Sequence, residues 1–107
     1  MVDLLAMMKK AQAMQAKLAD AQDELARLEV EGRSGGGMVR IVLTGKGEMK
    51  AIAIDPSLLT PADKEMVEDL ILAAYADAKG KADRLSAEKM QSLAAGLQLP
   101  PGMKLPF

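Results

Sequence analysis

The chain has 107 residues, a length that accommodates one small domain. It contains no cysteine and no histidine, which excludes disulfides, zinc fingers and catalysis by a thiolate or an imidazole. Its 14 basic and 15 acidic residues leave a net charge of −1, which provides no overall attraction toward a polyanion. Any nucleic-acid function must therefore depend on where the charges lie along the chain.

No apolar run in the sequence approaches the roughly 18 residues that a membrane-spanning helix needs. The N-terminus, Met-Val-Asp-Leu-Leu, lacks the basic region and cleavage site of a signal peptide. We therefore expect a soluble protein of the cytoplasm with no membrane partner.

Residues 1–28 are predicted to form one long helix. Apolar residues recur there at alternating spacings of three and four, a heptad pattern that places them on one stripe. Neither glycine nor proline interrupts the segment, and Asp3 sits near its start, where a negative charge suits the helix dipole. The stripe consists of Leu4, Met7, Ala11, Met14, Leu18, Ala21, Leu25 and Leu28.

Residues 29–55 change to a period of two, which is typical of strands. The alternation is clearest in Met38–Thr44 and resumes at Ile52, after a hairpin turn expected at Gly45–Gly47. Glu29–Ser34 is predicted as a further strand, joined to the next by three consecutive glycines. The segment therefore predicts a three-stranded antiparallel sheet with one apolar face.

A second long helix is predicted over residues 61–93. Thr60 can cap its start, and Pro61 fits the first helical position. Asp63 can close a contact like that of a capping box, and Gly96 lies just past the expected end. The apolar stripe of this helix is Val67, Leu70, Ile71, Ala74, Tyr75, Ala78, Ala82 and Leu85.

Residues 97–107 contain three prolines, which favour an extended or disordered tail over a helix. The sequence shows no internal repeat and no second core. We therefore expect residues 1–107 to form a single domain of the α+β class, with the element order α-β-β-β-α.

The predicted helices are long for a domain of this size. At 1.5 Å per residue they measure about 40 Å and about 50 Å. A compact globule of this length is roughly 35 Å across, so both helices should extend past the sheet. An apolar stripe that extends into water favours a partner, and the mixed face of the sheet would leave Met38 and Val42 exposed. A homodimer is the simplest arrangement; the alternative is a self-contained helical hairpin packed on the sheet.

The charges are unevenly distributed along the two helices. If the helices run antiparallel, residue 1 and residue 93 meet at a common tip. Residues 1–17 hold three lysines and one aspartate, a net of +2, and residues 79–107 hold five bases and two acids, a net of +3. Basic tips suit a polyanion such as the DNA backbone. The alternative is that acids at helix N-termini and bases at C-termini only complement the dipoles.

Several functional signatures are missing from the sequence. The glycines at 32 and 35–37 fit neither dinucleotide-binding nor phosphate-loop spacing, and a strand follows them. EF-hand spacing is missing as well. Two aromatic residues cannot form a base-stacking platform. We therefore expect no enzyme activity, no cofactor, no metal site and no small-molecule substrate.

Several segments together resemble the YbaB/EbfC family of bacterial nucleoid-associated proteins. The resemblance runs over nearly the whole chain, from the Met7–Gln15 pattern through Ile54–Leu59, Asp63–Leu70 and Ala73–Ala78 to Gln98–Phe107. The resemblance implies a tweezer-like homodimer that binds double-stranded DNA and resides in the nucleoid. It also implies effects on nucleoid organisation and gene expression, and no enzyme activity.

The family's DNA contacts are attributed to the two flanking helices, which agrees with the basic tips. By position and charge, the candidate DNA-binding residues are Lys9, Lys10, Lys79, Lys81, Arg84 and Lys89. These side chains would contact phosphates and read bases little or not at all.

The alternative function is that of an assembly or chaperone-like protein, whose helical arms clasp a polypeptide. The apolar heptad stripe and the nine methionines favour it. Salt distinguishes the two functions, because polyanion binding weakens steeply with salt and apolar contact does not.

Overall fold

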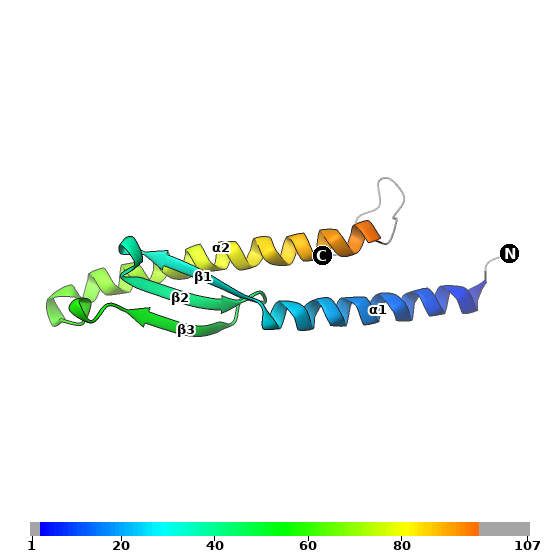
Figure 1. Cartoon of the computed structure of the whole chain (residues 1–107), viewed down its shortest axis with the longest axis horizontal. Helices are drawn as coiled ribbons and strands as arrows, with labels where there is room; N and C mark the ends of the chain where they lie inside the picture. The colour runs from blue at the N-terminus through cyan, green and yellow to red at the C-terminus, as the bar shows by residue number, and fades with distance from the viewer. Residues whose placement is uncertain (1–2, 97–107) are drawn as a thin grey trace.

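Two long helices flank a three-stranded sheet in the computed structural model, which describes residues 3–96 (Figure 1). The order α-β-β-β-α is the one predicted from the sequence, while the tail predicted at 97–107 lies outside the described residues. The helices and strands are α1 (Leu4–Arg27), β1 (Glu29–Ser34), β2 (Val39–Thr44), β3 (Met49–Ile54) and α2 (Lys64–Gly96).

Helix α1 begins at a side-chain cap. The Asp3 carboxylate accepts hydrogen bonds from the backbone amides of Leu5 at 3.1 Å and Ala6 at 3.2 Å. Two of the amides that a helix start leaves unpaired are thereby satisfied. The helix ends when Leu28 turns to an extended backbone, and β1 follows directly. This short junction fixes the direction in which α1 leaves the sheet.

The sheet is antiparallel, with the strand order β1-β2-β3. Three consecutive glycines make the turn between β1 and β2, and Gly36 has a φ of 66°, which favours glycine. The face toward α2, here called the inner face, carries Val39, Ile41 and Leu43, and all three are fully buried. The opposite face is called the outer face.

Helix α2 lies against β1 more closely than most side chains would permit. A Cβ atom at Gly32 would come within 2.2 Å of the Ala74 carbonyl oxygen and 2.3 Å of the Ala78 amide nitrogen. Ala74 and Ala78 are themselves fully buried. The sequence pattern therefore thins to alanine in α2 because the helix backbone touches the strand.

Two polar contacts fix α2 along β1. The Ser34 hydroxyl donates to the Leu70 carbonyl at 2.5 Å, and the Arg33 amide donates to the Asp77 carboxylate at 3.0 Å. The amide of Arg33 is the main cause of the lowered pKa of Asp77. Together with the close contact at Gly32, these two hydrogen bonds fix the distance of α2 from β1 and its position along the strand.

The start of α2 differs from the prediction. Pro61–Asp63 forms a short 3-10 turn, and the α-helix proper begins at Lys64. The Thr60 hydroxyl donates to the Asp63 carboxylate at 2.9 Å, so it does not cap a backbone amide. The helix also continues to Gly96, three residues beyond the predicted end at residue 93.

The molecule is elongated, with principal extents of 73 × 25 × 16 Å. Its radius of gyration is 19.9 Å, against about 13 Å for a compact chain of similar length. Helix α1 continues well past the end of α2 (Figure 1). Leu93 lies beside Lys17, well short of Leu4 at the start of α1. The prediction that the two helices end at a common tip is therefore wrong, because the first half of α2 lies across the sheet and does not run beside α1.

On the sheet, the exposed apolar residues lie on β3 and not at Met38 and Val42. Met38 and Val42, expected to be exposed, are half-buried. Helix α2 lies over β1 and β2, and the inner face of β3 is left open, with Ile52 at 45% and Met49 at 52% exposure. Tyr75, predicted to belong to the buried stripe of α2, is 37% exposed.

The contact at Gly32 yields a prediction about stability. Gly32→Ala places a methyl group against the backbone of α2, so the free energy of unfolding should fall by about 3 kcal/mol. Urea unfolding followed by circular dichroism measures this change.

Gly80→Ala is the matched control. Apart from its chain neighbours and the adjacent backbone of α2, no atom lies within 4 Å of a Cβ built at Gly80. Alanine there should raise stability by about 1 kcal/mol through helix propensity. Equal effects of the two substitutions would contradict the close contact at Gly32.

Candidate nucleic-acid interface

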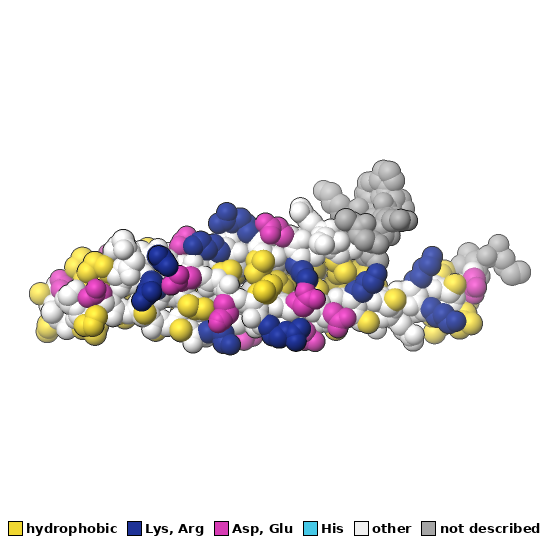
Figure 2. Space-filling view, in the orientation of Figure 1, with side chains coloured by type: hydrophobic (Ala, Val, Ile, Leu, Met, Phe, Trp, Pro, Cys, Tyr) yellow, Lys and Arg dark blue, Asp and Glu magenta, His cyan; other side chains and the backbone are white. Residues whose placement is uncertain are grey.

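The first half of α1 projects as a basic arm. Residues 4–16 of α1, called the α1 arm below, include Lys9 and Lys10 and no acidic residue. Both lysines are exposed, and neither forms an ion pair with the residues described in the structure. In the view of Figure 2, the charged side chains toward the free end of α1 are mostly Lys and Arg.

Dipole complementarity does not explain the lysines of the α1 arm. A helix favours acids near its N-terminus and bases near its C-terminus. The ends of α1 follow that order, with Asp3 at the start and Arg27 in the last turn, but Lys9 and Lys10 lie in the N-terminal half, where the dipole does not favour a base. The lysines of the α1 arm therefore call for another explanation, and a bound anion provides one.

Two basic residues in the middle of α2 form ion pairs with acidic residues of the same helix. Lys79 binds Asp83 at 2.6 Å, and this hydrogen bond raises the pKa of Lys79. Lys81 lies 3.4 Å from Asp77 and also donates to the Glu31 carbonyl at 2.7 Å. Exposed ion pairs of this kind contribute little to stability, so a phosphate can compete for the lysines.

Lys81 and Arg84 lie on one side of α2 and line a shallow hollow with Val30, Leu85 and Glu88. Lys79 points to the other side, where its Nζ would lie 3.6 Å from a Cβ at Gly47 in the β2–β3 turn. The three residues therefore do not form one patch. The structure brings together Lys81 and Arg84 and separates Lys79 from them.

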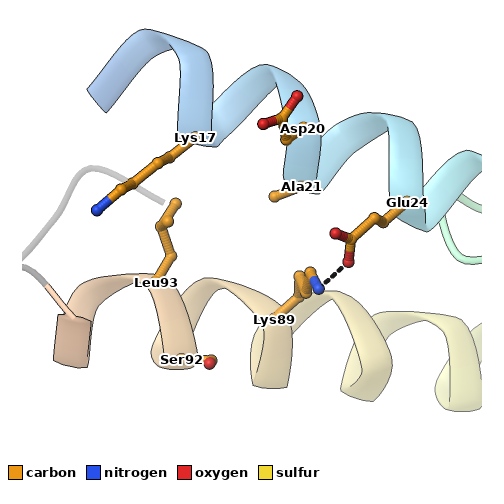
Figure 3. Close-up of a pocket in the computed structure, with 7 residues that line it drawn as sticks. All are labelled: Lys17, Asp20, Ala21, Glu24, Lys89, Ser92 and Leu93. Atoms are coloured by element: carbon orange, nitrogen blue, oxygen red, sulfur yellow. Dashed lines mark hydrogen bonds and ion pairs between the residues drawn. The ribbon is translucent and has the colours of Figure 1, made fainter. Parts of the chain in front are cut away.

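Lys89 is directed at α1, and its side chain is 34% exposed. It forms an ion pair with Glu24, which links the two helices across a cleft of about 320 Å³ (Figure 3). Lys17, Ala21 and Leu93 line the same cleft. The hydrogen bond from Lys89 is the largest cause of the lowered pKa of Glu24. Unlike the other candidates, Lys89 therefore serves mainly to link α2 to α1.

Two arginines on the outer face of the sheet were missed by the sequence reasoning. Arg33 and Arg40 are cross-strand neighbours on β1 and β2. They share Glu31, with N–O distances of 2.9 Å from Arg33 and 4.0 Å from Arg40. The signal that could have found them is the strand register, which puts residues 33 and 40 opposite each other. Figure 2 shows blue and magenta side chains mixed in this region.

Other kinds of site find no support in the part of the chain that the structure covers. Among residues 3–96, no cluster of acidic side chains could hold a metal ion. No helix in that range is long and apolar enough to cross a bilayer.

Comparisons with known proteins agree on one family. A sequence model of the YbaB/EbfC DNA-binding family matches residues 1–97. A nucleoid-associated protein of Methylocella silvestris is 57% identical over 107 residues, covering 100% of both chains. A nucleoid-associated protein of Agrobacterium fabrum is 54% identical with the same full coverage.

A solved structure supports the fold. The crystal structure of an uncharacterized protein from Helicobacter pylori matches with a TM-score of 0.69 at 24% identity. The match covers 91% of this chain and 98% of the other.

The link between Glu24 and Lys89 yields a prediction about pH. Because Lys89 lowers the pKa of Glu24 below 4.5, the contact stabilises the pairing of α1 with α2 above that pH. Its contribution should be lost as the pH falls through the lowered pKa. An NMR titration of the Glu24 carboxyl carbon should give a higher pKa in Lys89→Met than in the unchanged chain.

Lys17→Met is the control, since Lys17 lines the same cleft but forms neither an ion pair nor a hydrogen bond with Glu24. In that variant the pKa of Glu24 should be nearly the same as in the unchanged chain. If Lys89→Met also leaves the pKa of Glu24 unchanged, the contact between Lys89 and Glu24 is wrong.

Proposed function

The chain belongs to the YbaB/EbfC DNA-binding family, and on that premise we propose that it binds double-stranded DNA as a homodimer through basic faces of its helical arms. The observation that carries the proposal is the α1 arm. Lys9 and Lys10 project on an acid-free segment, and neither the helix dipole nor an ion pair within the described chain accounts for them.

The mechanism of binding is phosphate contact. Lysines on a projecting helix neutralise backbone phosphates and release counterions, which requires no base contact. Lys79, Lys81 and Arg84 on α2 add further cations, and phosphate competes there with exposed carboxylates. We therefore expect little sequence preference and a steep dependence on salt.

The homodimer is supported by the open inner face of β3. Ile52 and Met49 are exposed beside the buried inner-face residues of β2, and β3 is an edge strand of the sheet. Tyr75 lies one turn before Lys79 on the side of α2 that reaches the β2–β3 turn. An apolar patch beside an unpaired strand edge is suited to a second copy of the same surface. The dimer would double the number of basic arms.

The location of the protein follows from its function. The matched relatives are named nucleoid-associated proteins. Within the proposal, this chain resides in the cytoplasm on the nucleoid. There it affects nucleoid organisation and gene expression by occupying duplex DNA, without catalysing a reaction.

One observation favours the alternative function, in which the arms clasp a polypeptide. Leu4 is 71% exposed and Met7 is 55% exposed on the stripe of the α1 arm. Apolar binding of a peptide there would persist at a salt concentration that abolishes phosphate contact. Binding measured at low and high salt therefore decides between the two functions.

The proposal predicts a uniform loss of DNA affinity when α2 loses its bases. In the triple variant K79A/K81A/R84A, three cations are removed while the acids that accompany them remain. The Kd for every duplex tested should rise by a similar factor, about tenfold or more at low salt. Fluorescence anisotropy with duplexes of different sequence measures it.

The matched control removes three exposed cations that are not among the candidate DNA-binding residues, in K46A/K50A/K64A. The charge change is the same, so a Kd equal to that of the triple variant would show that only net charge matters. No change of Kd in K79A/K81A/R84A would remove these three residues from the interface.

The dimer proposal makes a separate prediction about β3. Ile52→Lys places a charge on the open inner face, and Ala53→Lys places the same charge on the outer face. Sedimentation equilibrium should give twice the 11.4 kDa chain mass for the unchanged protein and for Ala53→Lys. Ile52→Lys should sediment with the mass of one chain. A dimeric Ile52→Lys would place the interface elsewhere.

A further inference from the structure

The first two turns of α1 form an apolar surface with a lysine at each edge. The four large apolar side chains there are all more than half exposed, namely Leu4, Leu5, Met7 and Met8, called the arm tip below. At about 100° per residue, they cover about 160° of the helix surface. Lys9 and Lys10 lie just outside that arc, one on each side.

An apolar hollow lies at the opposite end of the molecule, where α2 begins. Its volume is about 440 Å³, and its lining includes Leu58, Leu59, Pro61, Val67 and Glu68. Leu58 is buried, whereas Leu59 is 64% exposed. Figure 2 shows hydrophobic side chains gathered at this end. The hollow, called the α2-start hollow below, therefore presents apolar surface to solvent.

Acidic residues accompany the α2-start hollow. Residues 58–72 hold four acids and one base, a net of −3. Glu65 and Glu68 are exposed, and neither forms an ion pair with the part of the chain that the structure describes. The helix dipole favours Glu65 in the first turn of α2, but its effect has faded at Glu68 in the second. The α1 arm has the opposite charge, a net of +2.

We propose that the arm tip of one copy docks into the α2-start hollow of a second copy, so that chains associate end to end. The two surfaces match in character, because each is apolar at its centre and the charges beside them are of opposite sign. Apolar side chains of the arm tip leave water against Leu58 and Leu59, while Lys9 and Lys10 approach the acids of α2.

The occupant is a second copy because the two surfaces cannot meet within one chain. The described molecule is 73 Å long, and the arm tip and the α2-start hollow lie at its two ends (Figure 1). A contact between two different surfaces of identical chains is heterologous. Such a contact continues from copy to copy unless the rotation between copies closes a ring.

The contact is small and therefore weak. A hollow of about 440 Å³ accepts a few side chains and not a whole helix. The buried area then lies below the roughly 1,200 Å² of a stable interface, and weak contacts of that class form at high protein concentration. We expect association at about 1 mM chain, where a dimer through β3 is already complete.

End-to-end contact depends neither on DNA binding nor on the β3 dimer. Lys9 and Lys10 would face phosphates on DNA and acids of α2 in the end-to-end contact, so duplex DNA and the next copy compete for the same arm. The β3 surface takes no part in this contact. The test is therefore made without DNA, and the growth of mass with concentration is followed whether it starts from one chain or two.

Small-angle X-ray scattering of DNA-free protein at low salt measures the association. As the chain concentration rises to about 1 mM, the apparent mass should rise about twofold above its dilute value. The maximum dimension should increase with it, because the copies join at their ends. A mass that stays constant over the whole concentration range would overturn the proposal.

Charge reversal tests which surfaces meet. K9E/K10E reverses the arm and E65K/E68K reverses the charge beside the hollow, so each variant alone should associate about tenfold more weakly. An equimolar mixture should regain the growth, because every arm then finds a hollow of opposite charge. Growth of E65K/E68K equal to that of the unchanged chain, or a mixture that does not grow, would overturn the proposal.

D23K/E29K is the matched control. Asp23 and Glu29 are exposed acids outside the α2-start hollow, and their reversal changes the net charge as much as E65K/E68K does. This variant should grow with concentration like the unchanged chain. If its growth is lost to the same extent as in E65K/E68K, net charge alone governs the association and the docking of the arm tip is wrong.

Discussion

The close approach of α2 to β1 is the constraint on which the rest of the structure depends. Gly32 lets the helix backbone at Ala74 and Ala78 touch the strand, where any side chain would be in collision. The bonds from Ser34 to Leu70 and from Arg33 to Asp77 then fix the register. These contacts therefore fix both the distance of α2 from the sheet and its orientation over β1 and β2.

Two exposed surfaces follow from that placement. The inner face of β3 is left uncovered, which exposes Ile52 beside the buried core. The free end of α2 stops beside Lys17, so α1 alone continues beyond it. The first surface is suited to a second copy of the chain, and the second presents two lysines on a projecting helix. Both proposals about function thus originate in the packing at Gly32.

Local patterns were sufficient to predict the elements, and long-range packing decided the rest. The heptad of α1, the β-strand alternation and the turn glycines gave the correct element order. The same patterns could not show how far α2 travels across the sheet, so the common tip and the burial of Tyr75 were wrong. Candidate bases were chosen by charge and by position along the chain, which could not reveal that Lys89 is directed at Glu24. The pair Arg33 and Arg40 needed the strand register.

The central claim is that a nearly neutral chain binds duplex DNA because its cations are placed on projecting arms. The most direct measurement is the Kd of the unchanged protein for a random-sequence duplex across a salt series, with its mass in solution determined alongside. The account predicts a species of twice the chain mass whose log affinity falls linearly with log salt, with a slope of about 0.9 for each phosphate contacted. Absence of binding at low salt, or affinity that does not change with salt, would contradict it.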